Sequence, residues 1–419
     1  MRLSMHRGAG ATGYNLVEIA TDRTKIMLAC GRTLPLMDCR TDDEFIDVPG
    51  LTSGVSAYDA VFVPSYHADQ GNLIARIHAD IPVYMNADTK IMLDIAADFA
   101  DLPLPRVTKY LEHGVSEQVG DIRILPLGVD HGMMGRMLFL VEATGKKLLY
   151  TGGCKRIDPA YYAMLGKIDM LLCDAVHIGN KEDADLMEAE GIAADLMRRT
   201  EKHVFILGDP TDADRIRYIE RACRESGRTM AFDPFMKSIL ERLSRPLIVD
   251  PYGFIPYVDA DFVKSPRLQK HIMMNRDMEF HEIKQFATAQ SVANMTNLTF
   301  MLRPSMGRFL TQLDALTPLA GAVLICFLWR GYEETSPMKE FLALGHTLGM
   351  KCTFLRASDH VYRRQLETAV LRLNPAALVP IQTVGAKMLR VFHDHVILLD
   401  DGDVFDANNE SKSGFTPQS

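Results

Sequence analysis

The chain has 419 residues, of which 47% are hydrophobic and 24% charged, and its formal net charge at pH 7 is -8. This length exceeds that of one ordinary compact domain and predicts two domains, one of which interrupts the other. The negative charge argues against general attraction to polyanions, although a local basic groove stays compatible with it. No apolar run approaches the roughly 20 residues of a membrane span, and no secretory core or paired C-x-x-C spacing is seen. We therefore expect a cytoplasmic protein with reduced thiols and no membrane partner.

The first part of the chain alternates strands with helices. Residues 14–30 predict a β-hairpin, and residues 60–63 predict a short apolar strand that runs into a polar turn carrying His67 and Asp69. Further elements are expected as a helix, a strand and a helix at 73–78, 81–85 and 87–99. Such alternation is typical of a layered α/β fold, in which side chains at strand ends form the site.

The character of the sequence then changes twice. Strands are expected at 107–111, 121–127, 136–143, 146–151 and 168–174, the last ending on Asp174. From about 183 to 345, long helical segments alternate with short strands, and after 345 we expect a strand, a helix, a strand and a closing hairpin at 351–357, 362–373, 377–381 and 396–405. This predicts a discontinuous domain of residues 1–182 and 346–407, an inserted domain of 183–345, and a disordered polar tail of 408–419.

The turn S-Y-H-A-D-Q, from Ser65 to Gln70, closely resembles the metal-binding motif H-x-H-x-D-H of the metallo-β-lactamase superfamily. Ser65 stands where the first histidine would be and Gln70 where the last would be. Further segments resemble the β-CASP branch of that superfamily in the expected order: HRGAGATGYNLVEI, MLACG, IPVYMNADTKIML, VDHGMMGRMLFLVEATGKKLLYTGG, LLCDAVH, DADRIRYIERACRESGRTMAFD, LRPSM, WRGY, ASDH and LNPAALVPIQTV. The β-CASP branch includes ribonuclease J and the endonuclease subunits of messenger-RNA 3′-end processing. The resemblance covers almost the whole chain.

This resemblance implies an αββα sandwich with an inserted β-CASP-like α/β domain, and two zinc ions that share a hydroxide at the strand ends. Carried over residue by residue, it assigns the first metal to Ser65, His67 and His131. It assigns the second metal to Asp69, Gln70 and Gln382, with Gly153 in the place of a bridging aspartate. Among these positions, the usual metal ligands are His67, Asp69 and His131.

The replaced ligands predict a weakened metal centre. Serine is a poor zinc ligand, glutamine amides suit harder cations, and glycine has no side chain. Ala29 also stands where the family usually has aspartate. We therefore expect no tightly bound cofactor, or a single weakly held divalent metal, zinc or manganese. Cys154 lies one position after the missing bridging aspartate and His177 three positions after Asp174, but the alternation of side chains along a strand favours an outward direction for such neighbours.

The resemblance also implies a substrate side of the site. Asp174 and His360 match the acid and the histidine that β-CASP enzymes place beside the scissile phosphate, where a histidine suits proton donation to the leaving oxygen. Ser358 matches a phosphate-contacting turn, although Asp359 adds a negative charge beside it. Arg303 and Ser305 resemble an anion-facing turn of the inserted domain.

These residues support two main hypotheses. In the first, the chain is a non-catalytic or impaired homologue that binds RNA or a nucleotide, as a homodimer or paired with an active relative. In the second, it is an active metal-dependent phosphodiesterase or ribonuclease with a single or rearranged metal site. A small-molecule hydrolase of the lactamase kind fits poorly, because it leaves the large insertion unexplained.

Overall fold

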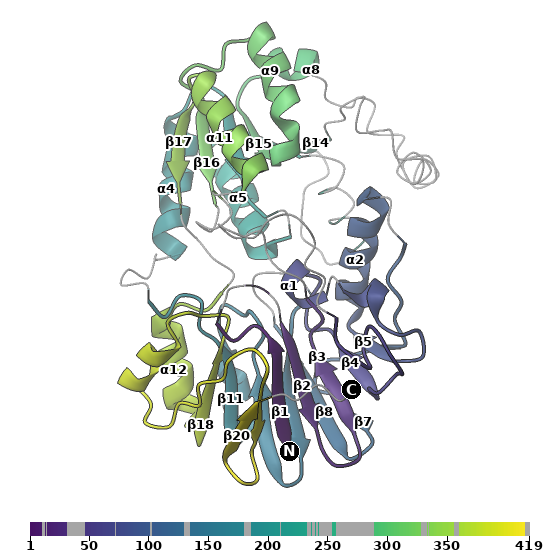
Figure 1. The fold of residues 1–419 in the computed structure, drawn as a ribbon. Helices are drawn as coiled ribbons and strands as arrows, with labels where there is room; N and C mark the ends of the chain where they lie inside the picture. The colour runs from purple at the N-terminus through teal and green to yellow at the C-terminus, as the bar shows by residue number, and fades with distance from the viewer. Residues whose placement is uncertain are drawn as a thin grey trace. The chain divides into compact units, whose positions relative to one another are not determined.

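The computed structural model describes residues 1–10, 13, 15–31, 47–71, 73–100, 103–129, 135–179, 186–209, 211–232, 236, 239, 242, 254–256, 289–327, 333, 335–355 and 360–414. The chain divides into two compact units (Figure 1). Unit 1 consists of Met1–Leu93, Pro105–Asp183 and Asp359–Ser419, and unit 2 of Asp94–Leu104 and Ala184–Ser358. We expected the first domain to resume at residue 346. The strand that follows instead pairs within the sheet of unit 2, because its backbone completes a parallel ladder there.

Unit 1 contains a mixed sheet that, within the described residues, has the order β20-β19-β1-β2-β3-β4-β5-β6. Its strands are β1 (Arg2–Arg7), β2 (Leu16–Ala20), β3 (Lys25–Leu28), β4 (Ala60–Phe62), β5 (Val83–Met85), β6 (Lys109–Tyr110), β19 (Asp403–Asp406) and β20 (Ser411–Gly414). The predicted hairpin is confirmed as β2 and β3, which pair in antiparallel fashion. At its turn, Thr21 Oγ1 accepts the backbone N–H groups of Arg23 and Thr24. Strand β1 was not among the predicted elements.

A second sheet of unit 1 has the order β18-β11-β10-β9-β8-β7 in the described part of the chain. Its strands are β7 (Glu117–Val119), β8 (Ile122–Gly128), β9 (Met137–Ala143), β10 (Lys146–Tyr150), β11 (Met170–Asp174) and β18 (Ala377–Ile381). The two sheets share a buried core in which Phe62 meets Phe139, and Phe139 stacks on Tyr150. Unit 1 is therefore a sheet-on-sheet sandwich.

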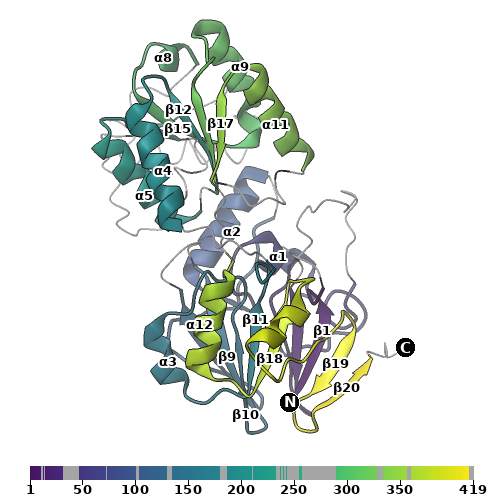
Figure 2. The same cartoon turned by 90° about the vertical axis from the view of Figure 1, so that its left-hand side faces the viewer.

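Helical elements cover the outer faces of this sandwich. Helices α3 (Pro159–Leu165) and α12 (Arg363–Leu373) and the 3-10 helix η6 (Ala386–Val391) pack on the second sheet, as Figure 2 shows for α3 and α12. The first sheet is covered by residues of the 48–81 segment, including the 3-10 helix η1 (Ile74–Arg76), and by Leu93 of α2 (Ala87–Ala100). A short helix, α1 (Ala68–Gly71), follows β4.

Unit 2 is built around a parallel sheet of order β14-β13-β15-β12-β16-β17 among the described residues. Its strands are β12 (Val204–Leu207), β13 (Thr229–Phe232), β14 (Phe254–Pro256), β15 (Leu298–Leu302), β16 (Val323–Cys326) and β17 (Lys351–Phe354). Alternate side chains of β12 enter opposite cores: one formed with α4 (Leu186–Arg199) and α5 (Ala213–Glu225), the other with α8 (Ala289–Ala293), α9 (Gly307–Leu316) and α11 (Ser336–Thr347). Covering both faces is typical of parallel sheets, and the predicted α/β class is confirmed.

Two expectations about the C-terminal region were wrong. The closing hairpin predicted at 396–405 is instead formed by β19 and β20, which pair in antiparallel register from Asp403 opposite Gly414 to Asp406 opposite Ser411. The tail predicted to be disordered therefore contributes an edge strand. The N–H and C=O groups on the side of β19 that faces away from β1 are open to pairing with an extended segment. Polar side chains in the tail do not prevent this main-chain pairing. Within the described residues, the helices are too short and too polar to cross a membrane.

Candidate functional site

The residues that the sequence singles out in unit 1 lie where its strands end. Ser65 follows β4, Gly153 follows β10, and Asp174 is the last residue of β11. Gln382 comes directly after β18, and His360 lies shortly before α12. Because β10, β11 and β18 run parallel, their carboxyl ends meet at one edge of the second sheet. The predicted site residues of unit 1 are therefore expected to lie close together at these strand ends.

Asp174 and His360 form a buried side-chain pair. Nδ1 of His360 is hydrogen-bonded to Oδ2 of Asp174, whose side chain is fully buried, whereas 13% of the His360 side chain is exposed. The second carboxylate oxygen accepts the backbone N–H of Val176 at 2.9 Å, and the backbone N–H of Asp174 donates to Thr151 Oγ1 at 3.2 Å. An aspartate fixed in this way orients the imidazole and leaves Nε2 as the nitrogen turned away from the carboxylate. The structure thus brings the two predicted catalytic residues together.

Ser65 and Gln70 are hydrogen-bonded to each other across the turn that follows β4. Ser65 Oγ donates to Gln70 Oε1 at 2.8 Å, and both residues are buried. The main chain of Gln70 is also fixed, because its carbonyl accepts the N–H of Cys30 at 2.8 Å and its N–H donates to the carbonyl of His67 at 2.9 Å. The side chains at two expected ligand positions are therefore engaged with one another.

Gly153 lies between Gln70 and His360. A Cβ atom added at Gly153 would be 3.2 Å from Gln70 Nε2 and 3.2 Å from His360 Cε1. Contacts this short require the neighbouring side chains to move, so the space that a bridging aspartate would need is already occupied. Four positions that were far apart in the sequence thus converge: 70, 153, 174 and 360.

His177 and Cys154 are both buried next to this cluster. The His177 ring stacks on Tyr362 at 4.9 Å between centroids and meets His360 edge to face at 6.2 Å. Burial, assisted by His360, lowers the pKa of His177 to about 4 even though Asp174 opposes the shift, so this imidazole is neutral at neutral pH. Burial likewise raises the pKa of the Cys154 thiol to about 12, which keeps it protonated in the metal-free protein.

Two strand ends near the site hold residues in the left-handed backbone region. Ala29, after β3, has φ of 63°, and Gln382, after β18, has φ of 60°. Non-glycine residues with positive φ are uncommon, and Asn, Asp and His tolerate this region better than most. The family resemblance expects aspartate at position 29 and a metal ligand at position 382, where this chain has alanine and glutamine. The unfavourable backbone conformation is present although the expected side chain is not.

The residues with usual metal-binding side chains are only partly described. His67 is half-buried, and its backbone N–H points to Ser65 Oγ at 3.3 Å, while Asp69 lies in α1. His131 lies outside the described residues. Among the residues that are described, no cluster of three or more His, Cys, Asp or Glu side chains could hold a metal ion. A weakly held metal involving His131 stays a prediction.

The predicted phosphate-binding residues are divided between regions. Arg303 is half-buried and precedes the 3-10 helix η5 (Pro304–Met306), in which Ser305 is exposed. Both belong to unit 2, whereas the Asp174 and His360 pair belongs to unit 1. Ser358 lies outside the described residues. Their joint contact with a phosphate stays a prediction.

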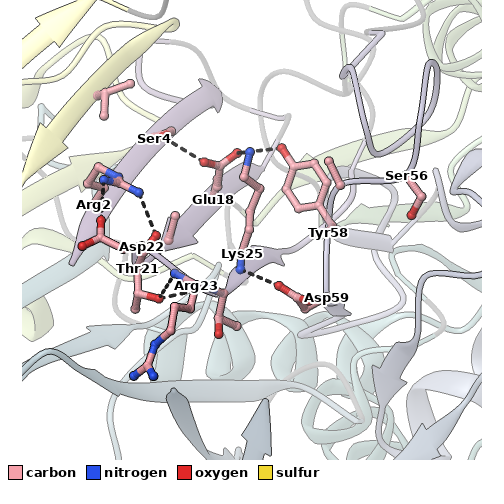
Figure 3. Close-up of a pocket in the computed structure, with 14 residues that line it drawn as sticks. Arg2, Ser4, Glu18, Thr21, Asp22, Arg23, Lys25, Ser56, Tyr58 and Asp59 are labelled. Atoms are coloured by element: carbon pink, nitrogen blue, oxygen red, sulfur yellow. Dashed lines mark hydrogen bonds and ion pairs between the residues drawn. The ribbon is translucent and has the colours of Figure 1, made fainter. Parts of the chain in front are cut away.

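A second polar site was missed by the sequence reasoning. A pocket of about 730 Å³ lies over β1 to β3 and is lined by charged side chains that include Arg2, Arg23 and Lys25 (Figure 3). At its base, the buried Glu18 accepts a hydrogen bond from Tyr58 at 2.6 Å and contacts His6 Nε2 at 3.0 Å. The polar residues Ser4 and His6, two positions apart, could have indicated a polar face of β1. Without the pairing of β1 with β2, however, they do not identify Glu18 as their partner.

Glu18 stays ionised in this setting. Burial favours its neutral form, but the hydrogen bonds with His6 and Tyr58 outweigh burial and lower the pKa of the carboxyl. Burial and the charge of Glu18 raise the pKa of Tyr58, which therefore acts as a donor. Lys25 completes the group, with Nζ 3.9 Å from the carboxylate.

Comparison with known proteins found a match in structure and none in sequence. No protein-family model matches the chain, and no curated protein matches it. The chain is similar to a solved structure. This is the crystal structure of a protein of unknown function from Enterococcus faecalis V583, with 17% sequence identity and a TM-score of 0.69. The match covers 96% of this chain and 99% of that one, so the architecture is shared over its full length.

Proposed function

We propose that this chain is a metallo-β-lactamase-fold protein of the β-CASP type that binds RNA or a nucleotide and has lost the usual dinuclear zinc hydrolysis. The observation that carries this proposal is the convergence of Asp174, His360 and Gly153. The pair expected beside a scissile phosphate is retained and correctly joined, while the position of the bridging ligand between Gln70 and His360 is a glycine.

The layering of unit 1 supports the fold assignment. Two facing sheets with helical elements on both outer faces match the αββα arrangement that the resemblance implies, and unit 2 matches an inserted α/β domain. The inserted unit also favours RNA or a nucleotide over the substrates of a lactamase-like hydrolase, which would leave this unit unexplained. Arg303, at a turn of unit 2, has the forked donors that suit a phosphate.

The residues present do not fit a dinuclear zinc centre. Zinc sites use imidazole, thiolate or carboxylate ligands. Here the Ser65 hydroxyl and the Gln70 amide oxygen are bonded to each other, and Gly153 supplies no ligand. In this proposal, Asp174 and His360 contribute to ligand binding through their own hydrogen bonds.

Binding of a labelled single-stranded RNA, measured by fluorescence anisotropy, tests the proposal. We expect affinity to fall steeply between about 50 and 200 mM salt, because backbone binding releases counterions. His360→Ala should weaken binding at least tenfold, whereas His346→Ala, at an exposed position of α11, should leave it unchanged. No binding at low salt, or an equal loss in both variants, would contradict the proposal.

The alternative is an active phosphodiesterase or ribonuclease with one metal or rearranged ligands. It is motivated by the retention of His67, Asp69 and His131 together with the Asp174 and His360 pair. Shortening of 5′-labelled RNA with added Mn²⁺ or Zn²⁺, abolished by His131→Ala, would favour it. Cleavage that persists in that variant would identify a contaminating nuclease.

A further inference from the structure

We propose that Ser65, Gln70 and Gly153 form one interlocked, metal-free unit in which the Gln70 side chain takes over the cross-linking position of a metal. The glycine at position 153 is then explained by packing against Gln70, in addition to the absence of a metal ligand at that position. That these positions correspond to metal ligands rests on the proposed function. The packing relation among the three residues does not.

Gln70 connects three separate segments of unit 1. Its carbonyl accepts the N–H of Cys30, which lies shortly after β3, and its side chain accepts a hydrogen bond from Ser65, after β4. On its other side, the same amide lies 3.5 Å from the position of a Cβ on Gly152 and 3.2 Å from that of a Cβ on Gly153. With only 1% of its surface exposed, Gln70 fills the space where these three strand ends meet. A metal ion would hold these strand ends through ligands from each of them, whereas Gln70 does so through its main-chain bond to Cys30 and the packing of its side chain beside Gly152 and Gly153.

The backbone does not explain the glycine at 153. Gly152 adopts a positive φ of 53°, which favours glycine, whereas the φ of Gly153 lies outside the left-handed region. An L-residue is therefore compatible with the main chain at 153, and the restriction comes from neighbouring side chains. A Cβ there would meet Gln70 Nε2 and His360 Cε1, both at 3.2 Å.

Neither neighbour is a free end that can swing away at little cost. The Gln70 amide is held by the hydrogen bond from Ser65 at 2.8 Å, and the His360 ring is held by Asp174. Overpacking a site with fixed neighbours forces rotamer or backbone shifts. Restoring a carboxylate at 153 therefore requires a change at 70, and the two positions are expected to depend on each other.

A double-mutant cycle tests this dependence. Gly153→Ala should lower the thermal unfolding midpoint by about 4 °C in the wild-type background and by about half as much when combined with Gln70→Ala, which removes one of the two close contacts and leaves that with His360. Gly128→Ala serves as the matched control, because its Cβ would be no closer than 3.7 Å to its neighbours. That substitution should cause a small and equal shift in both backgrounds.

Equal shifts for Gly153→Ala in the two backgrounds, or no shift in either, would overturn the inference. If Gln70→Ala does not fold, Ser65→Ala replaces it, since it frees the amide without removing it. Metal analysis of the wild-type protein after dialysis against zinc and then metal-free buffer should show well under one zinc per chain. One zinc or more would also overturn it. RNA binding enters none of these readouts, so failure of the proposed function and failure of this inference are distinguishable.

Discussion

Removal of His360 is the perturbation for which the structure gives the clearest magnitude. In His360→Ala, the fully buried Asp174 carboxylate loses its imidazole partner and retains the 2.9 Å hydrogen bond from Val176. Breaking a buried pair by removing one partner costs about 3 to 5 kcal/mol. Because 13% of the His360 side chain is exposed, water can reach the vacated space, and we expect the lower end, about 3 kcal/mol.

Asp174→Asn should cost less, about 1 to 2 kcal/mol, because the asparagine carbonyl oxygen can still accept the N–H of Val176 and no uncompensated charge remains. Urea unfolding followed by circular dichroism at neutral pH measures both values. The double variant should cost less than the sum of the single variants, since the stranded charge is absent from it. Strict additivity, or a larger effect for Asp174→Asn than for His360→Ala, would refute the interpretation of these two residues as an energetically coupled buried pair.

Three further predictions concern the packing of each unit. Glu18, with its pKa lowered in the folded state, contributes stability above its unfolded pKa that is lost as pH falls through its folded pKa. Glu18→Gln should therefore flatten the acid limb of a plot of stability against pH, and an unchanged limb would contradict this. Ala29→Gly should lower the free energy of unfolding by about 1 to 2 kcal/mol less than Ala60→Gly in β4, because only position 29 has a positive φ that glycine relieves. Urea titrations of the two variants measure this difference. Arg228 donates to four main-chain carbonyls and a threonine hydroxyl while buried, so Arg228→Met should cost about 3 kcal/mol, whereas the exposed Arg224→Met should cost under about 0.5. Equal effects of the two arginine substitutions would show that the buried hydrogen bonds contribute nothing net.

Elements with strong local patterns were predictable from the sequence. The β2 and β3 hairpin, the helix α2 and the strands β8 to β11 follow from apolar runs separated by turn residues. Strand β1 and the β19 and β20 hairpin were not predicted, because their place depends on pairing between the two ends of the chain. Arg2 lies opposite Asp406, and no local pattern reports a partner at that separation.

In the candidate site too, contacts between residues far apart in the sequence were not predictable. The identities of Asp174 and His360 came from motif resemblance, and their hydrogen bond follows once α12 and β11 are folded against each other. The contact between Gln70 and position 153 has no local signature, because the two positions lie 83 apart in the sequence and the contact arises from side-chain volume. Sequence reasoning noted each replacement but had no means to relate one replacement to another.

That relation changes how the replacements should be weighed. From the sequence, Ser65, Gln70 and Gly153 are separate losses, and their number is the argument that a metal centre is no longer needed. In the structure, Ser65 holds the Gln70 amide and Gln70 occupies the space beside Gly153, so under our proposals the three replacements depend on one another. Replacements that depend on one another count less than independent ones as evidence that a metal centre was lost, because one substitution makes room for the next. They are stronger evidence that the arrangement is maintained. A site without function is not expected to gain a buried, hydrogen-bonded pair such as Ser65 and Gln70 beside the pair of Asp174 and His360.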